Sequence, residues 1–389
     1  MIKKTKFIIV YSMITILVTG CWNKSDINER SIVVAVGLDK TENNKIEVTL
    51  QIAKIKENEG NSGSGNSENL AWTNSYKGDT VFEAIRNQLK VVNRKPFFGH
   101  VKLMVIGEEL AKEGIIETVN FFERDHELKL TPYVLISKGI SAKKVLKAKS
   151  DLEDLSAIHI ETIIKNSEAN SKINKTLFID MLRAMNRPGQ DPLLGVIKPN
   201  NKENIKKVSN LEAEGSAILK NHKLVGWLSG KETRAYLMMN NKVKDTIINV
   251  NDPIEKGKKV SIEIFKLKGS RKVINRKKDI KIIIDIDANG NIGGQQSPYD
   301  LSNEKMLKKL EIEVENKIKK EIGELINIAQ KKYNSDFLGF NKLVHKRYSH
   351  YWNTIEKNWN EEFSKINTEV NVKVKIKRTG LVTSPTTPK

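Results

Sequence analysis

The pattern of apolar and polar positions in the first half of the chain predicts alternating strands and helices. Residues 31–38 form a continuous apolar run rich in valine, which is typical of a buried strand, and residues 45–54 alternate between apolar and polar positions. The polar segment 39–44 between these two runs predicts a β-hairpin. Helices are expected next at 81–89, 110–122, 141–164 and 177–185, and strands between them at 101–106 and 133–136. This alternation favours a mixed α/β domain.

A change in composition separates this half from the second. Residues 187–210 contain three prolines together with glycines, asparagines and a basic cluster, so we expect the main domain boundary there. Apolar side chains recur every three or four positions from Leu307 to Ala329, which predicts a long helix with Ser302 as its N-terminal cap. Strands are predicted at 215–219, 224–228, 259–267, 280–286 and 370–376, the last with one apolar face and one basic, solvated face.

The first twenty residues have the pattern of an export signal. Three lysines form a basic segment, and residues 7–18 are apolar at all but two positions. This stretch is shorter than the ~20 residues that a membrane-spanning helix needs. It ends in the residues LVTGC at 17–21, which resemble the lipobox of bacterial lipoproteins. We therefore expect cleavage before Cys21 and a diacylglycerol on its thiol, which gives stable membrane attachment. An uncleaved signal anchor is the alternative.

These patterns predict an α+β, multi-domain chain of mixed sheets packed with helices, after a cleaved lipoprotein signal peptide. Its 389 residues are enough for two or three domains. The expected divisions are a signal peptide (1–20), an N-terminal α/β region of one or two subdomains (21–190), a linker (191–210), a C-terminal α+β domain (211–380) and a flexible tail (381–389).

Charge and cysteine content restrict the partners and the covalent chemistry. The formal net charge is +20; three of these charges precede Cys21, so +17 remain after cleavage. Such a surplus favours an anionic partner, either nucleic acid or anionic lipid, although lysines that only aid solubility are an alternative. Because an exported chain meets lipid and cell-wall polymer, we expect no nucleic-acid partner. A single cysteine excludes an intrachain disulfide framework and a thiolate metal cluster.

Sequence motifs for catalysis or metal binding are absent. The six histidines lack the i, i+4 spacing of a helical zinc site, and no HExxH, GxSxG, Walker or GxGxxG motif occurs. Pairs of acids such as Glu108 and Glu109 are typical of solvated helix faces. We therefore predict no catalytic residue, no cofactor and no metal site, and only Cys21 as a functional residue.

Aromatic residues are concentrated near the C-terminus. They are Tyr333, Phe337, Phe340, Tyr348, Tyr351, Trp352, Trp359 and Phe363. They could line a groove for a ligand or partner, but a core between packed helices is the simpler interpretation, and we favour it.

Several short segments, taken together in chain order, resemble the sequence pattern of a known protein family. They are 21–29, 37–40, 98–102, 105–115, Arg124-Asp125, 215–217, 224–228, 232–234, Asp336, Gly339-Phe340, His345-Lys346, Tyr348, Trp352 and Trp359. Together they resemble the Ger(x)C family of spore germination lipoproteins, the C subunits of nutrient germinant receptors, over residues 21 to about 380. The chain departs from the family pattern at Ser349, where a proline is expected.

The resemblance implies a non-enzymatic subunit with mixed α+β domains in an elongated body. It implies a lipid anchor on Cys21 at the outer face of the spore's inner membrane, and action with two integral-membrane partners, the A and B subunits, in sensing nutrients. The main alternative is a lipid-anchored solute-binding protein of a transporter, which predicts two similar α/β lobes around a ligand cleft. An envelope hydrolase would need a nucleophile or metal constellation that the sequence lacks.

Overall fold

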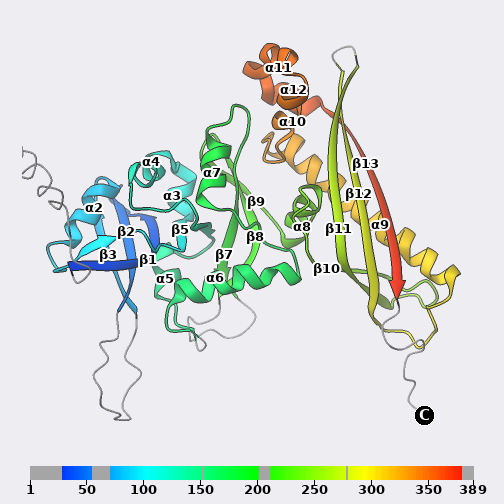
Figure 1. Ribbon diagram of the computed structural model, residues 1–389, viewed down its shortest axis with the longest axis horizontal. Helices are drawn as coiled ribbons and strands as arrows, with labels where there is room; N and C mark the ends of the chain where they lie inside the picture. Colours follow the sequence, from blue (N-terminus) through cyan, green and yellow to red (C-terminus); the bar gives the residue numbers. More distant parts are fainter. Residues whose placement is uncertain (1–28, 55–70, 151–152, 201–210, 277–278, 379–389) are drawn as a thin grey trace, which may run out of the picture.

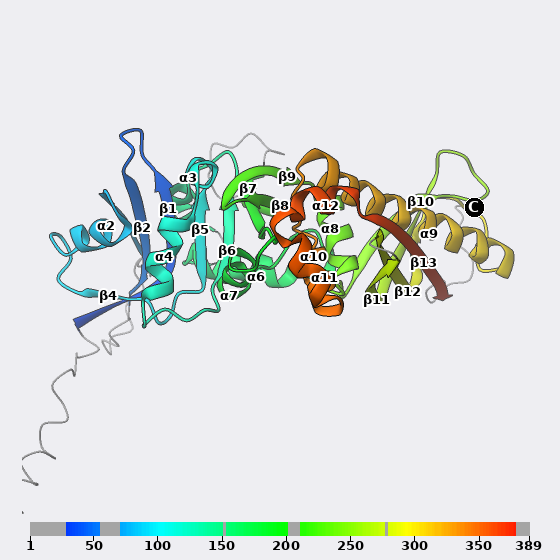
Figure 2. The same cartoon turned by 90° about the horizontal axis from the view of Figure 1, so that it is seen from above.

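The computed structural model of the chain describes residues 29–54, 71–150, 153–200, 211–276 and 279–378. Within these ranges the chain forms an elongated body with one β-sheet toward each end (Figures 1 and 2). The predicted signal peptide, Cys21 and the predicted tail lie outside the described residues.

The first sheet has nine strands and a parallel centre. Strands β1, β5, β6 and β7 run parallel to one another, and antiparallel pairs extend the sheet on both sides. The short strand β4 (Lys95–Phe97) pairs with the start of β1. The remaining strands, in spatial order, are β3 (Ala71–Gly78), β2 (Ile46–Ala53), β1 (Arg30–Lys40), β5 (Leu103–Gly107), β6 (Tyr133–Ser137), β7 (Leu193–Pro199), β8 (Leu211–Lys220) and β9 (Lys223–Leu228).

Helices cover both faces of this sheet, which explains why its central strands are apolar throughout. In β1, Val33 and Val36 belong to one buried core and Val34 and Ala35 to another. The first core includes helices α2 (Val81–Gln88), α3 (Glu108–Glu113), α4 (Ile116–Arg124) and α7 (Phe178–Met185). The second includes α5 (Ala142–Lys147) and α6 (Ser156–Asn166). The predicted mixed α/β architecture is confirmed.

Buried Asp39, at the end of β1, holds α5 in place. Its carboxylate oxygens accept hydrogen bonds from the backbone N–H groups of Ala142 and Lys143, each at 2.8 Å. Burial raises the pKa of Asp39, and these two hydrogen bonds oppose the rise. Gly107 lies beside this carboxylate, where an added Cβ would collide with it. Asp39 and Gly107 both lie in segments that resemble the family, and the packing here gives each of them a structural role.

The second sheet has four strands in the order β10 (Thr246–Asn251), β11 (Lys259–Arg276), β12 (Asp279–Gln295) and β13 (Asn367–Arg378). Helix α9 (Glu304–Asn327) packs along one face of it (Figure 1). The long helix and the two-faced final strand were predicted, but the cap of α9 is Asn303 rather than Ser302, because the Asn303 side chain accepts a hydrogen bond from the Met306 N–H.

Short helices complete the second domain. Helix α8 precedes β10, and a π-helical turn follows α9 directly. Helices α10, α11 and α12 gather at one end of this domain (Figure 1). Their bounds are α8 (Gly230–Met239), the π-helical turn (Ile328–Lys332), α10 (Phe340–Arg347), α11 (Ser349–Ile355) and α12 (Trp359–Lys365).

The structure differs from the sequence analysis around the predicted linker 191–210. Strand β7 lies within that segment, and β8 and β9, which were assigned to the second domain, pair in the first sheet. Pro188 and Gly189 do follow the end of α7, but the residues Leu193 to Ile197 form a buried apolar run that enters the sheet. Burial of this run outweighs the breaker composition around it, so the first sheet continues past residue 190.

Candidate functional site

Cys21, the one functional residue that the sequence predicts, lies outside the described residues. Within the ranges that the structure describes, His, Cys, Asp and Glu side chains form no group that could hold a metal ion. None of the helices in the described part of the chain has the length and apolarity needed to cross a bilayer. Polar side chains gather instead where the first sheet meets the second domain.

Asp336 is the centre of this junction. It is fully buried, and its carboxylate accepts hydrogen bonds from the backbone N–H groups of Phe340 (2.9 Å) and Asn341 (2.7 Å) and from the indole N–H of Trp359 (3.1 Å). The carboxylate therefore caps the first turn of α10. Burial raises the pKa of Asp336 to about 6, although the three hydrogen bonds act in the opposite direction.

The segment 186–192 of the first domain docks directly on this capped turn. The Asn341 side chain donates a hydrogen bond to the Pro188 carbonyl at 2.7 Å, and the Ser335 hydroxyl donates to the Asp191 carboxylate at 2.7 Å. Gly189 has a φ of 71° and lies against the Trp359 ring, so a side chain there would meet both backbone strain and a steric clash. The two domains are therefore joined by specific contacts.

The C-terminal aromatic residues form the core beneath these contacts, as we favoured from the sequence. Trp352 and Trp359 are buried with ring centroids 5.0 Å apart, and Phe363 lies against Trp359. The ring of His345 stacks on Trp352 at 5.5 Å, so this histidine has a packing role. The same core includes apolar side chains of the first sheet, which makes the junction continuous; they are Leu193, Ile218 and Leu228.

A buried ion pair stabilises the second domain close to this junction. The Arg234 guanidinium on α8 donates three hydrogen bonds, of 2.6, 2.7 and 3.3 Å, to the Glu321 carboxylate on α9, and it also donates to the Ile247 carbonyl at 2.9 Å. Both side chains are buried. Removing one partner of such a pair leaves an uncompensated buried charge, so this pair fixes the helices relative to β10.

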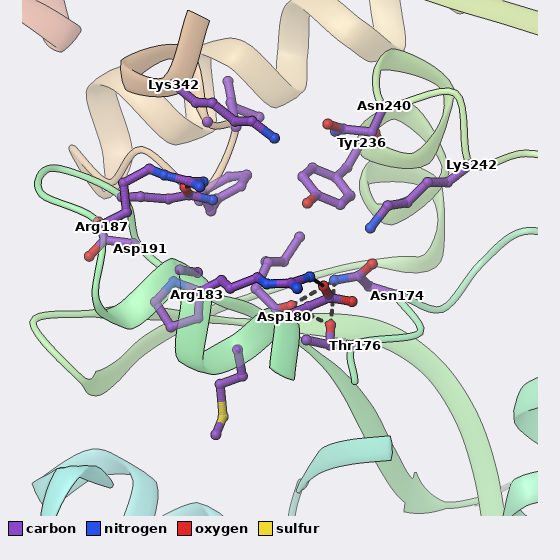
Figure 3. A pocket seen from close by; sticks show the side chains of 18 of the residues that line it. Asn174, Thr176, Asp180, Arg183, Arg187, Asp191, Tyr236, Asn240, Lys242 and Lys342 are labelled. Carbon is purple, nitrogen blue, oxygen red and sulfur yellow. Dashed lines mark hydrogen bonds and ion pairs between the residues drawn. The ribbon is translucent and has the colours of Figure 1, made fainter. Parts of the chain in front are cut away.

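A cavity of about 440 Å³ opens between the two domains (Figure 3). Arg183 and Asp180 on α7 lie on one side of it and form an ion pair at 3.5 Å. Lys242 and Lys342 point toward it from the second domain on the opposite side. Together the walls carry five basic and two acidic side chains: Arg183, Arg187, Lys242, Arg271 and Lys342, and Asp180 and Asp191.

The electrostatics of the cavity suit an anionic group. The Arg271 guanidinium donates a hydrogen bond to the Leu338 carbonyl. Desolvation by the surrounding protein lowers the pKa of Arg271 and of Lys242, although Lys242 is an exposed residue. Buried Asn174 presents an amide oxygen that has no hydrogen-bond partner in the described structure. These groups can bind a carboxylate or phosphate, but they contain no arrangement of nucleophile and base for covalent catalysis.

Sequence reasoning did not find this cavity. Its walls come from α7, α8, β11 and the turn before α10, which are far apart along the chain. The one available signal was the set of resembling positions Asp336, Gly339-Phe340 and Trp359, which all belong to the junction.

Comparison with protein families matches most of the chain. Residues 23–199 match the model described as the spore germination protein N-terminal domain. Residues 214–380 match the model described as spore germination B3/GerAC like, C-terminal. The two models follow one another in chain order.

Individual relatives are similar over nearly their full length. Spore germination protein KC of Bacillus subtilis (strain 168) is 25% identical over 410 residues, covering 99% of this chain and 98% of that protein. Spore germination protein B3 of the same organism is 24% identical over 383 residues, covering 97% and 98%. The crystal structure of the GerBC protein matches 88% of this chain and 96% of its own, with a TM-score of 0.58 and 19% identity, which shows a shared fold.

Proposed function

Because the chain belongs to the Ger(x)C family of spore germination proteins, we propose that it is the lipid-anchored C subunit of a nutrient germinant receptor. The observation that carries the proposal is the match of both family models, in order, along residues 23–199 and 214–380. The relatives named as spore germination proteins support it over the full length of the chain.

The proposal assigns the chain a place and partners. A diacylglycerol on Cys21 attaches it to the outer face of the spore's inner membrane, and it acts there with the integral-membrane A and B subunits. Attachment to the same membrane raises the effective concentration of this subunit near its partners without any new protein contact.

The architecture supports a non-enzymatic subunit better than a solute-binding protein. A solute-binding protein would have two similar α/β lobes, whereas this chain joins a nine-stranded mixed sheet to a four-stranded sheet with one long helix. The junction between them is held by the hydrogen bonds from Asn341 to the Pro188 carbonyl and from Ser335 to the Asp191 carboxylate, and by a shared apolar core, which favours a rigid body over a closing cleft.

Deletion of the gene in its spore-forming host tests the proposal. We expect purified mutant spores to lose dipicolinic acid release for one class of nutrient and to keep it for a non-nutrient trigger. Restoring the gene should restore the response. An unchanged response to every nutrient, in a strain that also lacks the paralogous receptors, would contradict the proposal.

The anchor is tested separately by the substitution Cys21→Ala. We expect less of the subunit in the membrane fraction and a weaker nutrient response, because two acyl chains provide most of the attachment. The matched control is the wild-type gene at the same locus, with both proteins quantified by immunoblot. Normal receptor levels and a normal response from the variant would show that the lipid is dispensable.

A further inference from the structure

Apolar side chains are exposed at the outer end of the first domain. On α2 and the turn after it, the exposed fractions are 52% for Phe82, 40% for Leu89 and 73% for Val91. Phe82 and Leu89 line a shallow groove of about 290 Å³, together with Phe98 and Phe121. Exposed apolar side chains that gather at one place mark a surface for contact with lipid or protein.

Basic side chains are concentrated beside this apolar surface, although Asp125 and Glu127 also line the groove. The segment 82–95 contains one acidic residue, Glu83, and four basic ones: Arg86, Lys90, Arg94 and Lys95. All four basic side chains are exposed, and in the described part of the chain none of them forms an ion pair. The Arg86 guanidinium lies 4.9 Å above the Phe82 ring. Exposed apolar side chains beside basic side chains without an acidic partner are the combination that binds the interface of an anionic bilayer.

The described chain also begins at this surface. Arg30 pairs with Lys95 in the parallel β1–β4 ladder, and its guanidinium lies 3.8 Å from the Glu127 carboxylate. Both Lys95 and Glu127 line the groove. Eight residue steps separate Cys21 from Glu29, and a chain of that length spans at most roughly 28 Å. A lipid on Cys21 would therefore keep this end of the molecule close to the membrane.

We propose that this surface, which we call the α2 face (Phe82, Leu89 and Val91 with Arg86, Lys90, Arg94 and Lys95), rests on an anionic phospholipid bilayer. The proposal rests on the lipid anchor of the proposed function. Phe82 and Val91 enter the headgroup region, while the basic side chains bind lipid phosphates. Figures 1 and 2 place α2 at the end of the body opposite the second sheet, so the second domain projects away from the membrane.

Vesicle binding by the non-lipidated mature chain tests this proposal. The mature chain with Cys21→Ala is sedimented with phosphatidylcholine vesicles with and without phosphatidylglycerol. We expect binding only when phosphatidylglycerol is present, and weaker binding at high salt. The triple variant Lys90→Gln, Arg94→Gln, Lys95→Gln should bind at least about tenfold more weakly, since each basic residue near the surface contributes to lipid attraction. Phe82→Ser should weaken binding without changing its salt dependence.

A matched triple variant lies at the other end of the molecule. Lys373, Lys375 and Lys377 are exposed on β13, and changing all three to Gln removes the same charge. We expect this control to keep vesicle affinity within about twofold of the unsubstituted chain. An equal loss in both triple variants would show general charge attraction and overturn the proposal, as would absence of binding to any vesicle.

A protein partner is the other kind of occupant for the α2 face. If Phe82→Ser spores fail to germinate while vesicle binding of that variant is unchanged, the face binds a protein and the lipid proposal is overturned. Because the vesicle measurement uses a chain without lipid and needs no spores, its failure is distinguishable from a failure of the receptor assignment.

Discussion

The domain junction and the α2 face are opposite in construction. At the junction, polar groups are buried and bonded to one another, as in the three hydrogen bonds that Asp336 accepts. At the α2 face, apolar groups are exposed, and Val91 has 73% of its surface in contact with solvent. Globular chains usually show the reverse of both arrangements.

The comparison separates residues that hold the fold from residues that are available for contact. A buried carboxylate is costly unless it is hydrogen-bonded, so the junction must keep its geometry for Asp336 to be tolerated. Exposed Phe82 and Val91 contribute little to folding, because most of their surface stays in water in the folded chain. Substitutions should therefore have large effects on stability at the junction and small ones at the α2 face.

The largest effect is expected for Asp336→Ala. This change leaves the N–H groups of Phe340, Asn341 and Trp359 buried without an acceptor, and each orphaned donor costs roughly 1–3 kcal/mol. We expect the free energy of unfolding to fall by about 4 kcal/mol or more, measured by urea denaturation. A loss below about 1 kcal/mol would mean that the junction relaxes freely and would remove the contrast with the α2 face.

A somewhat smaller loss is expected for Gly189→Ala. The added Cβ would lie 2.5 Å from Cδ1 of Trp359, and φ at this position is 71°. Strain and overpacking together should lower the free energy of unfolding by roughly 3 kcal/mol. Gly139→Ala is the matched control, because its φ is 70° with nothing within 4 Å of the added atom, and it should cost only about 1 kcal/mol. Equal losses would show that Trp359 moves aside.

Sequence patterns predicted elements well where the signal is local. Helix α9 was expected from the spacing of Leu310, Val314 and Ile318, and β13 from strict alternation, because both patterns depend on one face of one element. Segment 191–210 was predicted as a linker, but β7 lies within it and β8 and β9 complete the first sheet, whereas the two family models divide the chain between residues 199 and 214. Pro188 and Gly189 mark the place where the chain contacts the second domain, not the end of the first sheet.

The junction itself could not be predicted, because it depends on contacts between distant segments. Nothing near Asp336 in the sequence shows that its oxygens will meet the N–H of Trp359, or that Asn341 will bind the Pro188 carbonyl. The α2 face could be predicted only in part, for another reason. Leu89 fits the apolar stripe of the predicted helix and was expected to be buried, but it lies at the C-terminal cap of α2, where it is 40% exposed.

A pH dependence should also originate at the junction. Burial raises the pKa of Asp336 to about 6, so between about pH 4 and pH 6 the folded chain holds a proton that the unfolded chain has released. The resulting stability is fully present below about pH 4 and is lost as the pH rises through 6, by about 2 to 3 kcal/mol.

The variant Asp336→Asn isolates this contribution, because its side chain binds no proton. When the pH is lowered from about 7 to about 4, we expect the unfolding free energy of the wild-type chain to rise relative to that of the variant. A difference that stays constant between the two pH values would show that folding does not raise the pKa of Asp336.

The smallest effect on stability is expected for Val91→Ser at the α2 face. Val91 lies in the turn after α2 with 73% of its surface exposed, so the folded and unfolded states solvate it almost equally. We expect the free energy of unfolding to change by less than about 0.5 kcal/mol, whereas affinity for phosphatidylglycerol vesicles falls. Val36→Ser, in the buried centre of β1, is the contrasting control and should destabilise the chain strongly. If Val91→Ser destabilised the chain as Val36→Ser does, its exposed side chain would be part of the fold, and the reason for assigning the α2 face to a lipid surface would be lost.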